Sequence, residues 1–332
     1  MPRALITGIT GQDGQHLAEF LHSKGYQVVG LVKGQNNPKA NAVQEEFPFI
    51  EFVPGDLADL PSLIKAVEVA GPDEVYNLAA ISFVALSFNQ AELTANLTGL
   101  GVLRMLEAVR MVGGSVNNPI RFYQASSSEM FGKVREVPQT EATPFYPRSP
   151  YGCAKVFRHD ITVNYRESYD LCVLGDPVQP RGPASRVEFR DPQDHQHDKR
   201  GSSSASRTNW CSGTLDTKRD WGYAGDYVRA MWAMLQQDAP DDYVISTGET
   251  HTVEEFVAHA FAEVGIDDWK QYVRQDPKFM RPSEVDLLIG DSTKAREQLG
   301  WKPEVDFPGL VSMMVAHDLA YEARKAGISL PD

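Results

Sequence analysis

A tyrosine and a lysine in the middle of the chain have the spacing of an acid–base pair. Tyr151 and Lys155 are four residues apart, so on a helix the phenol and the ammonium lie on one face. The ammonium stabilises the phenolate form, which makes the tyrosine a usable base. Ser127 and Glu129 follow an apolar run upstream, and Ser127 can hydrogen-bond the hydroxyl that Tyr151 deprotonates. We predict redox chemistry on a hydroxyl group, with these four residues as the catalytic residues.

Two alternatives stand beside this interpretation. Taken alone, a tyrosine and a lysine at this spacing are more often a solvated surface pair, but Pro147 and Pro150 fix the turn into the helix and favour a catalytic site. Glu129 separates two kinds of chemistry. An epimerase needs no second acid or base at that position, whereas elimination of water next to a ketone does. Glu129 therefore favours a dehydratase over an epimerase.

A glycine-rich turn lies near the start of the chain. It follows a short apolar run and opens a helical pattern, which is the context of a phosphate-binding turn. Its glycines let the backbone approach a pyrophosphate, which binds at the helix N-terminus. The alternative is a plain tight turn. We predict dinucleotide contacts from Gly8, Ile9, Thr10, Gly11, Gln12, Asp13 and Gly14.

The end of the second predicted strand indicates which dinucleotide binds. An NAD enzyme has Asp or Glu there for the ribose hydroxyls, whereas this chain has Lys33, Gly34 and Gln35. A cation that no carboxylate opposes favours the 2′-phosphate of NADP. Further cofactor contacts are predicted at Asp56, Leu57, Leu78, Ala79, Ala80, Ser82, Tyr151 and Lys155.

Strands and helices alternate along the first half of the chain. Apolar runs predict strands at residues 4–7, 27–32, 49–53, 74–77 and 121–125, and helical spacing predicts helices at 15–24, 60–69 and 91–109. This alternation is typical of an α/β fold with a Rossmann-type, doubly wound parallel sheet. From about residue 253 the pattern changes to helices with short strands, which predicts a smaller C-terminal substrate-binding lobe.

Composition excludes several classes of partner. The 332 residues carry a formal net charge of −13, which disfavours sequence-independent binding to nucleic acid or to an anionic membrane.

The apolar run at residues 4–6 is too short for a signal peptide or a membrane span, so we expect a cytoplasmic protein. The three cysteines form no Cys-x-x-Cys pair and suit free thiols. His195 and His197 lack the spacing of further ligands, so no metal is expected.

An anionic ligand must therefore meet cations that are placed locally. Arg219 stands in an Arg-Asp-Trp run, and Arg281 stands three residues before Glu284. Each of these motifs alone is more often a solvated surface pair. Substrate contacts are predicted at Ser82, Ser127, Glu129, Arg219, Arg281 and Glu284.

Long stretches of the sequence resemble one known family, the GDP-mannose 4,6-dehydratases, which are extended short-chain dehydrogenases/reductases. These stretches cover both halves of the chain: residues 7–14, 76–80, 124–129, 144–151, 161–169, 218–228, 281–286 and 299–303. Members of the family usually have threonine where this chain has Ser127, a change that keeps the hydroxyl, and arginine where it has Lys33 and Gly34.

The resemblance implies an activity and an assembly. It implies conversion of GDP-mannose to GDP-4-dehydro-6-deoxymannose with a tightly held NADP, in which Tyr151 removes the O4 proton and Glu129 takes the C5 proton. It also implies a homodimer or homotetramer, since residues 91–109 and 151–169 resemble the helices that pair into a four-helix interface in this superfamily. Residues 1–172 would bind NADP, and residues 213–332 would mainly bind the nucleotide sugar.

Residues 173–212 depart from the family. They are rich in Asp, Ser and Pro and lack apolar periodicity, which is typical of a disordered loop. Where family members have Ile-Leu-Phe-Asn-His, residues 176–180 read Asp-Pro-Val-Gln-Pro, and reading the family codons one base early yields these residues. The segment looks frameshifted. Because Pro177 and Pro180 lack ladder donors, we expect no central strand here, and a catalytically impaired NADP-binding homologue is the alternative function.

Overall fold

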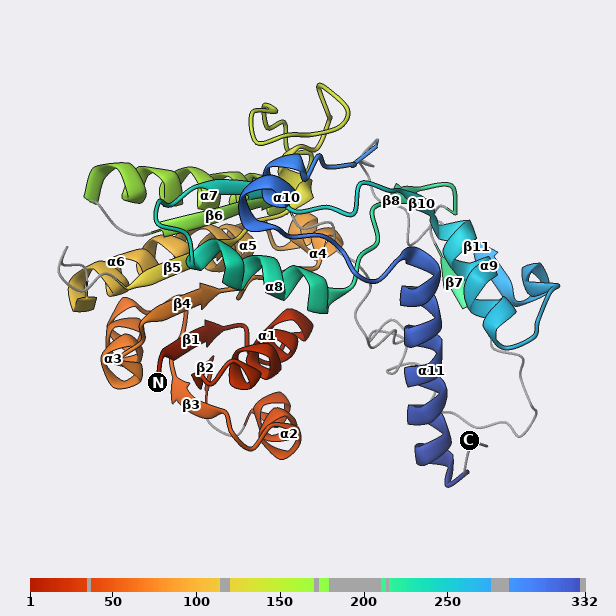
Figure 1. Ribbon diagram of the computed structural model, residues 1–332, viewed down its shortest axis with the longest axis horizontal. Coiled ribbons are helices and arrows are strands. Elements are labelled where there is room, and N and C mark those ends of the chain that lie inside the picture. Colours follow the sequence, from red (N-terminus) through yellow and green to blue (C-terminus); the bar gives the residue numbers. More distant parts are fainter. Residues whose placement is uncertain are drawn as a thin grey trace.

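The protein is described by a computed structural model that covers residues 1–34, 37–113, 120–169, 173–178, 210–212, 215–275 and 287–328. One end of the molecule holds a large sheet between two layers of helices, and the other holds two small sheets with helices α9 (Val253–Glu263) and α11 (Phe307–Ala326) (Figure 1). Within the described residues, none of the helices has an apolar stretch that could cross a bilayer. A cytoplasmic location stays a prediction.

The large sheet has seven strands in the order β3-β2-β1-β4-β5-β6-β9, and every neighbouring pair is parallel. The strand order reverses between β1 and β4, as it does in a doubly wound sheet. The predicted fold class is confirmed. The strands are β1 (Arg3–Thr7), β2 (Gln27–Val32), β3 (Glu51–Pro54), β4 (Glu74–Asn77), β5 (Arg121–Ala125), β6 (Val173–Val178) and β9 (Asp242–Val244).

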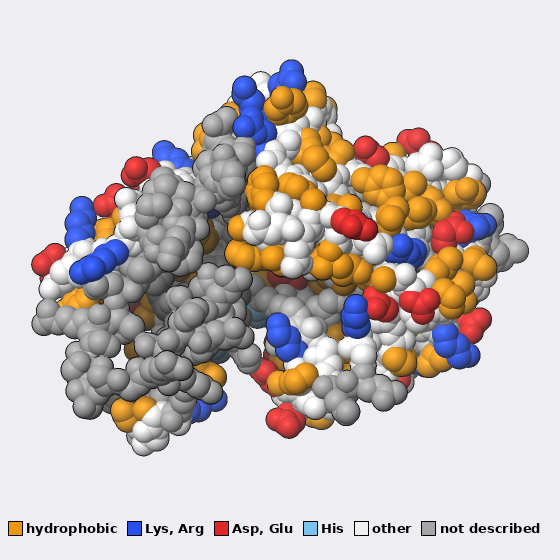
Figure 2. Space-filling model, turned by 180° about the vertical axis from the view of Figure 1, so that it is seen from behind, with side chains coloured by type: hydrophobic (Ala, Val, Ile, Leu, Met, Phe, Trp, Pro, Cys, Tyr) orange, Lys and Arg blue, Asp and Glu red, His pale blue; other side chains and the backbone are white. Residues whose placement is uncertain are grey.

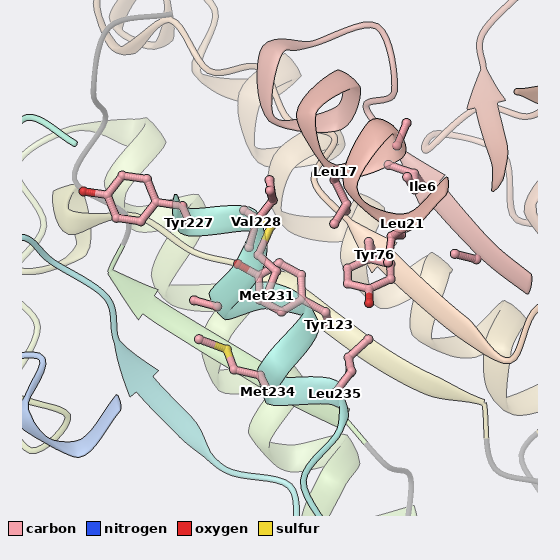
Figure 3. Close-up of a cluster of buried hydrophobic side chains, with 14 of the residues drawn as sticks. Ile6, Leu17, Leu21, Tyr76, Tyr123, Tyr227, Val228, Met231, Met234 and Leu235 are labelled. Atoms are coloured by element: carbon pink, nitrogen blue, oxygen red, sulfur yellow. The ribbon is translucent and has the colours of Figure 1, made fainter. Parts of the chain in front are cut away.

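Helices cover both faces of this sheet, which is why the strands can be apolar throughout. Helices α1 (Gln12–Ser23), α2 (Pro38–Glu46) and α8 (Ala224–Leu235) lie on one face, and α3 (Leu60–Ala70), α6 (Gly101–Gly113) and α7 (Pro150–Tyr169) lie on the other. Figure 3 shows Val228 and Met231 of α8 beside Tyr123 of β5, with Leu17 and Leu21 of α1 close by. Residues far along the chain therefore complete the N-terminal core.

The remaining elements are short or belong to the second half of the chain. They are α4 (Val84–Asn89), the 3₁₀ turns η2 (Ser128–Met130) and η4 (Trp269–Tyr272), β7 (Trp210–Ser212), β8 (Lys218–Arg219), β10 (His251–Thr252), α9 (Val253–Glu263), β11 (Val273–Gln275), α10 (Thr293–Leu299) and α11 (Phe307–Ala326). Strand β8 pairs with β10, and β7 pairs with β11. Helix α8 and strand β9 come from the second half of the chain but pack with elements of the first half. The predicted domain boundaries stay a prediction.

The helix predicted over residues 91–109 is divided into three parts. Helix α5 (Ala91–Thr94) is followed by the π-helix η1 (Ala95–Leu100) and then by α6. Gly99 and Gly101 have low helix propensity, and both face close neighbours. A Cβ atom added at Gly101 would lie 3.0 Å from the Cβ of Leu57. The glycines therefore fit the close packing at this turn.

The expectation that no central strand forms after α7 is wrong for residues 173–178. Strand β6 lies between β5 and β9 and pairs in parallel with both, and Ala125 pairs with Asp176. The register with β9 shifts between Gly175 and Val178, on either side of Pro177, which has no backbone N–H. Proline is tolerated in a sheet at such irregularities. The predicted disorder of the rest of the segment falls mainly on residues 179–209, which lie outside the described residues.

A buried carboxylate joins the strand-end loops of the second half of the chain. Asp220 is 2% exposed and accepts hydrogen bonds from the hydroxyls of Ser246 and Thr247 at 2.5 and 2.7 Å. The backbone N–H groups of Thr247 and Gly248 also donate to it, at 3.2 and 3.1 Å. Burial raises the pKa of this carboxyl, against the opposing effect of its donors. Asp220 therefore fixes the chain that follows β9.

Replacement of Asp220 tests this role. We expect Asp220→Ala to lower the free energy of unfolding by about 3 kcal/mol, because several buried donors lose their acceptor. Chemical denaturation monitored by circular dichroism measures the change. The exposed Asp238 offers a matched control, and Asp238→Ala should change the free energy of unfolding by less than about 0.5 kcal/mol. Equal stabilities of the two variants would contradict the role.

Candidate active site

The predicted site residues of the first half of the chain gather at one edge of the large sheet. The glycine turn follows β1, Lys33 follows β2, Asp56 and Leu57 follow β3, residues 78–80 follow β4, and Ser127 follows β5. All these strands are parallel, so their carboxyl ends meet at the same edge. The strand order reverses at this edge, where open α/β sheets bind their ligands.

The glycine turn is shaped for close backbone approach. Gly8 has a φ of +74°, which favours glycine, and the N–H of Gly11 donates to the Gly8 carbonyl at 2.9 Å. A Cβ atom added at Gly14 would lie 2.5 Å from the same carbonyl oxygen, and one added at Gly8 would lie 2.9 Å from the nitrogen of Ala79. Helix α1 begins at Gln12, so the N–H groups of its first turn face this turn. The turn can therefore receive an anion.

Helix α7 presents the predicted acid–base pair to this edge. Tyr151 and Lys155 are both buried, and the Lys155 ammonium lies 5.6 Å from the centre of the Tyr151 ring. Lys155 Nζ donates to the carbonyls of Ala125 and Ser126 at 3.1 and 3.2 Å. The lysine is thereby anchored on the end of β5. The arrangement places a cation beside a phenol in a dry environment, as the spacing predicted.

Ser127 and Glu129 lie in the turn that leaves β5. Ser127 is buried and caps η2 by accepting a hydrogen bond from the Glu129 N–H at 3.3 Å. The neighbouring hydroxyl of Ser126 is buried and has no hydrogen-bond partner among the described residues. Helix α7 packs against η2, so the turn with Ser126, Ser127 and Glu129 lies beside the helix that carries Tyr151. Their catalytic roles stay predictions.

Buried polar side chains form a hydrogen-bonded chain beneath this edge, and the sequence did not predict these contacts. Thr7 Oγ1 donates to Asn77 Oδ1 at 2.6 Å, and Asn77 Nδ2 donates to Gln124 Oε1 at 2.9 Å. The N–H of Ala79 donates to Thr7 Oγ1 at 3.0 Å. These bonds tie the ends of β1, β4 and β5 together. A polar residue at the end of each apolar strand was the signal that could have found them.

Lys33 forms an ion pair with a carboxylate. The prediction that no carboxylate opposes this cation is therefore wrong. Its ammonium lies 2.9 Å from the Asp56 carboxylate, because β2 and β3 are neighbours and both residues follow their strands. Burial alone would raise the pKa of Asp56, but the Ala58 N–H and the Lys33 ammonium outweigh it, and the pKa is lowered. A 2′-phosphate at Lys33 would therefore compete with Asp56.

The predicted substrate contacts divide into three groups. Ser82, Ser127 and Glu129 lie in the loops at the sheet edge. Arg219 lies on β8, in the second half of the chain, and donates to the Lys218 carbonyl at 2.8 Å. Arg281 and Glu284 lie outside the described residues, as do His195 and His197. In the part of the chain that the structure describes, no cluster of His, Cys, Asp and Glu could hold a metal ion.

The fold is that of the extended short-chain dehydrogenase/reductase class. Solved structures agree in fold. The UDP-glucose 4-epimerase of Thermotoga maritima with UDP-glucose has a TM-score of 0.80 at 23% identity and covers 96% of this chain and 99% of its own. The dTDP-glucose 4,6-dehydratase of Bacillus anthracis in complex with NAD has a TM-score of 0.77 at 19% identity and covers 99% of both chains.

Sequence comparison narrows the class. The chain belongs to the GDP-mannose 4,6-dehydratase family, whose sequence profile matches residues 5–314. GDP-mannose 4,6 dehydratase 1 of Arabidopsis thaliana is 46% identical over 97% of this chain and 91% of its own. The human GDP-mannose 4,6 dehydratase is 43% identical over 95% of this chain, and that of Yersinia enterocolitica is 42% identical over 96%; these alignments cover 91% and 94% of the relatives.

Proposed function

We propose that this protein converts GDP-mannose to GDP-4-dehydro-6-deoxymannose and water. The relatives that are named for this activity align with this chain over nearly their whole length. The observation that carries the proposal is the position of Glu129, which lies in the turn after β5 that packs against the helix of Tyr151 and Lys155. A carboxylate there supplies the second acid–base group that loss of water requires and an epimerase lacks.

A nicotinamide dinucleotide fits the residues of the sheet edge. The glycine turn leaves no room for side chains, so a ligand can approach its backbone. The buried hydroxyl of Ser126 has no hydrogen-bond partner among the described residues and could bind a ligand. We propose that the turn of residues 8–14 holds the pyrophosphate, that Asp56 and Leu57 lie beside the adenine, and that residues 78–80, Ser82, Tyr151 and Lys155 hold the nicotinamide end. When bound, such a cofactor supplies a hydride acceptor for C4 and a hydride donor for C6 of the hexose.

The side chains of this protein then move protons. Tyr151, as the phenolate beside Lys155, removes the proton of the C4 hydroxyl, and Ser127 hydrogen-bonds that oxygen. Oxidation at C4 acidifies the hydrogen on C5, and Glu129 takes it. The hydroxyl on C6 leaves as water with a proton from the active-site hydroxyl groups. Arg219, Arg281 and Glu284 are proposed to bind the nucleotide sugar.

Two substitutions separate the two proton transfers. Tyr151→Phe should lower the rate of C4 oxidation by about 10²–10⁴-fold, because it removes the base at O4. Glu129→Gln should leave C4 oxidation possible and block the loss of water, because an amide cannot accept the C5 proton. Reduced cofactor in a single turnover reports the first step, and the 4-keto product reports the second. A Tyr151→Phe rate within twofold of the original enzyme would refute the assignment.

The dinucleotide is proposed to be NADP rather than NAD, with a modest preference. Lys33 can bind a 2′-phosphate, but only by exchanging its contact with Asp56. We expect Lys33→Met to weaken NADP binding by about tenfold and to leave NAD binding unchanged. Quenching of tryptophan fluorescence in titrations with each dinucleotide measures both affinities. Equal affinities of the original enzyme for the two would contradict the proposal.

The protein is proposed to form at least a homodimer. Each of α5, η1 and α7 carries an exposed apolar side chain, namely Leu93, Leu100 and Phe157. Figure 2 shows hydrophobic side chains gathered on the half of the molecule that holds the large sheet. We expect Leu100→Glu to turn the oligomer into a monomer, because it places a charge in an apolar interface. Light scattering at micromolar concentration measures the mass, and a monomer before substitution would contradict the proposal.

A catalytically impaired NADP-binding homologue is the second candidate. The sequence of residues 179–209 is the observation that favours it, since these residues depart from the family. The 4-keto assay on this chain and on a chain with the family reading frame restored decides between the two. Product from both chains supports an active enzyme, product from the restored chain alone supports the impaired homologue, and product from neither contradicts the proposed function.

A further inference from the structure

The π-helix η1 and the start of α6 contact two loops that the proposed function assigns to the dinucleotide. The first is the loop after β3, with Leu57 at the proposed adenine end. The second is the loop after β4, residues 78–82, at the proposed nicotinamide end. π-helices are rare and occur frequently at functional sites. The proton transfers described above give η1 no part, so its contacts need an explanation.

Arg104 joins the loop after β3 to the π-helix. It lies on α6, four residues after η1 ends, and its Nη1 donates to the carbonyl of Leu57 at 3.0 Å. The same nitrogen donates to the carbonyl of Asn96 at 3.2 Å, and Nη2 donates to Asn96 Oδ1 at 2.8 Å. Asn96 lies on η1. Because the guanidinium is a planar fork with fixed donor directions, the two bonds to Asn96 also fix the direction of the bond to Leu57.

Leu57 is held at its side chain as well as at its carbonyl. Glycine at position 101 lets the side chain of Leu57 pack directly against the first turn of α6. A Cβ atom added at Gly101 would lie 3.0 Å from the Cβ and 3.4 Å from the Cδ1 of Leu57. The helix therefore sets the position of this residue through both its backbone and its side chain.

Thr98 binds the loop after β4 from the same π-helix. The threonine is fully buried, and its Oγ1 accepts a hydrogen bond from the N–H of Ile81 at 3.1 Å. Ile81 lies within residues 78–82, the proposed nicotinamide end. The π-helix also packs against α7, the helix that carries the proposed base. One short element thus contacts both loops and the catalytic helix.

We propose that η1 positions the two ends of the bound dinucleotide, with Arg104 acting on the adenine end through Leu57 and Thr98 acting on the nicotinamide end through Ile81. Both are positioning residues, because they act through the backbone of the loops. This inference rests on the proposed function, in particular on dinucleotide binding at the sheet edge. Since the two residues hold different loops, their replacement should affect different halves of the cofactor.

The experiment tests the two halves separately. ADP-ribose carries the adenine end, and nicotinamide mononucleotide carries the other. We expect Arg104→Met to weaken the binding of ADP-ribose, NAD and NADP by about tenfold, because a charged donor to the loop is lost. The affinity for nicotinamide mononucleotide should stay within about twofold of the original. Ligand-observed NMR titrations measure all four affinities.

Thr98→Val should show the reverse pattern. Valine keeps the shape of the side chain but cannot accept the N–H of Ile81, so we expect about fivefold weaker binding of nicotinamide mononucleotide. The affinity for ADP-ribose should stay within about twofold of the original. If Arg104→Met does not fold, this variant decides alone, since an unchanged affinity for nicotinamide mononucleotide would overturn the inference.

Two controls accompany these variants. Arg110→Met removes another arginine of α6, which pairs at the surface with Glu107, and all four affinities should stay unchanged. Leu100 of the proposed dimer interface also lies on η1, so light scattering should give both variants the mass of the original protein. A monomer with both halves of the cofactor bound more weakly would show that η1 serves the interface and would overturn the inference.

Other outcomes would also overturn it. Equal weakening of both halves in either variant would show that η1 only supports the fold. Weaker binding of NADP without weaker binding of NAD would show that Arg104 acts by its charge on the 2′-phosphate. The titrations need no GDP-mannose. If the original enzyme binds both halves but forms no product from GDP-mannose, the proposed activity fails, and the titrations still decide the role of η1.

Discussion

The proposed active site depends on two buried cations that join helix α7 to the sheet. Lys155 donates to two carbonyls at the end of β5, and Arg158 donates to two carbonyls at the end of β4. Tyr151 lies on the same buried stripe. The side chains that hold the strand ends therefore also place positive charge on the helix of Tyr151, the proposed base. Moving α7 relative to the sheet would alter both at once.

The rest of the molecule keeps this edge in place. The chain of Thr7, Asn77 and Gln124 spaces the ends of β1, β4 and β5, and the glycine turn contacts the loop after β4. Helix α8 comes from the second half of the chain and completes the core under α1. Asp220, a few residues before α8, anchors the loop after β9. The two halves of the chain thus share a core, which fixes both of them for a substrate that contacts both.

Much of this arrangement follows from local sequence. The strands at residues 27–32, 74–77 and 121–125 were predicted with the observed bounds, because continuous apolar runs and strand-end polar residues are local signals. The Lys33–Asp56 pair was not predicted, since it depends on β2 and β3 being neighbours. Arg158 was missed because a charged residue on a helix is usually solvated. Strand β6 was wrongly excluded, because a register shift accommodates Pro177.

We propose that one site first oxidises C4 of the hexose and then removes water from C5 and C6. GDP-mannose carrying deuterium at C4 tests it most directly. We expect the protein to form the 4-keto-6-deoxy product with the deuterium at C6, because the hydride taken from C4 is returned within the same turnover. Proton and deuterium NMR of the product locate the label. Recovery of a C4 epimer, or of product without deuterium at C6, would contradict the account.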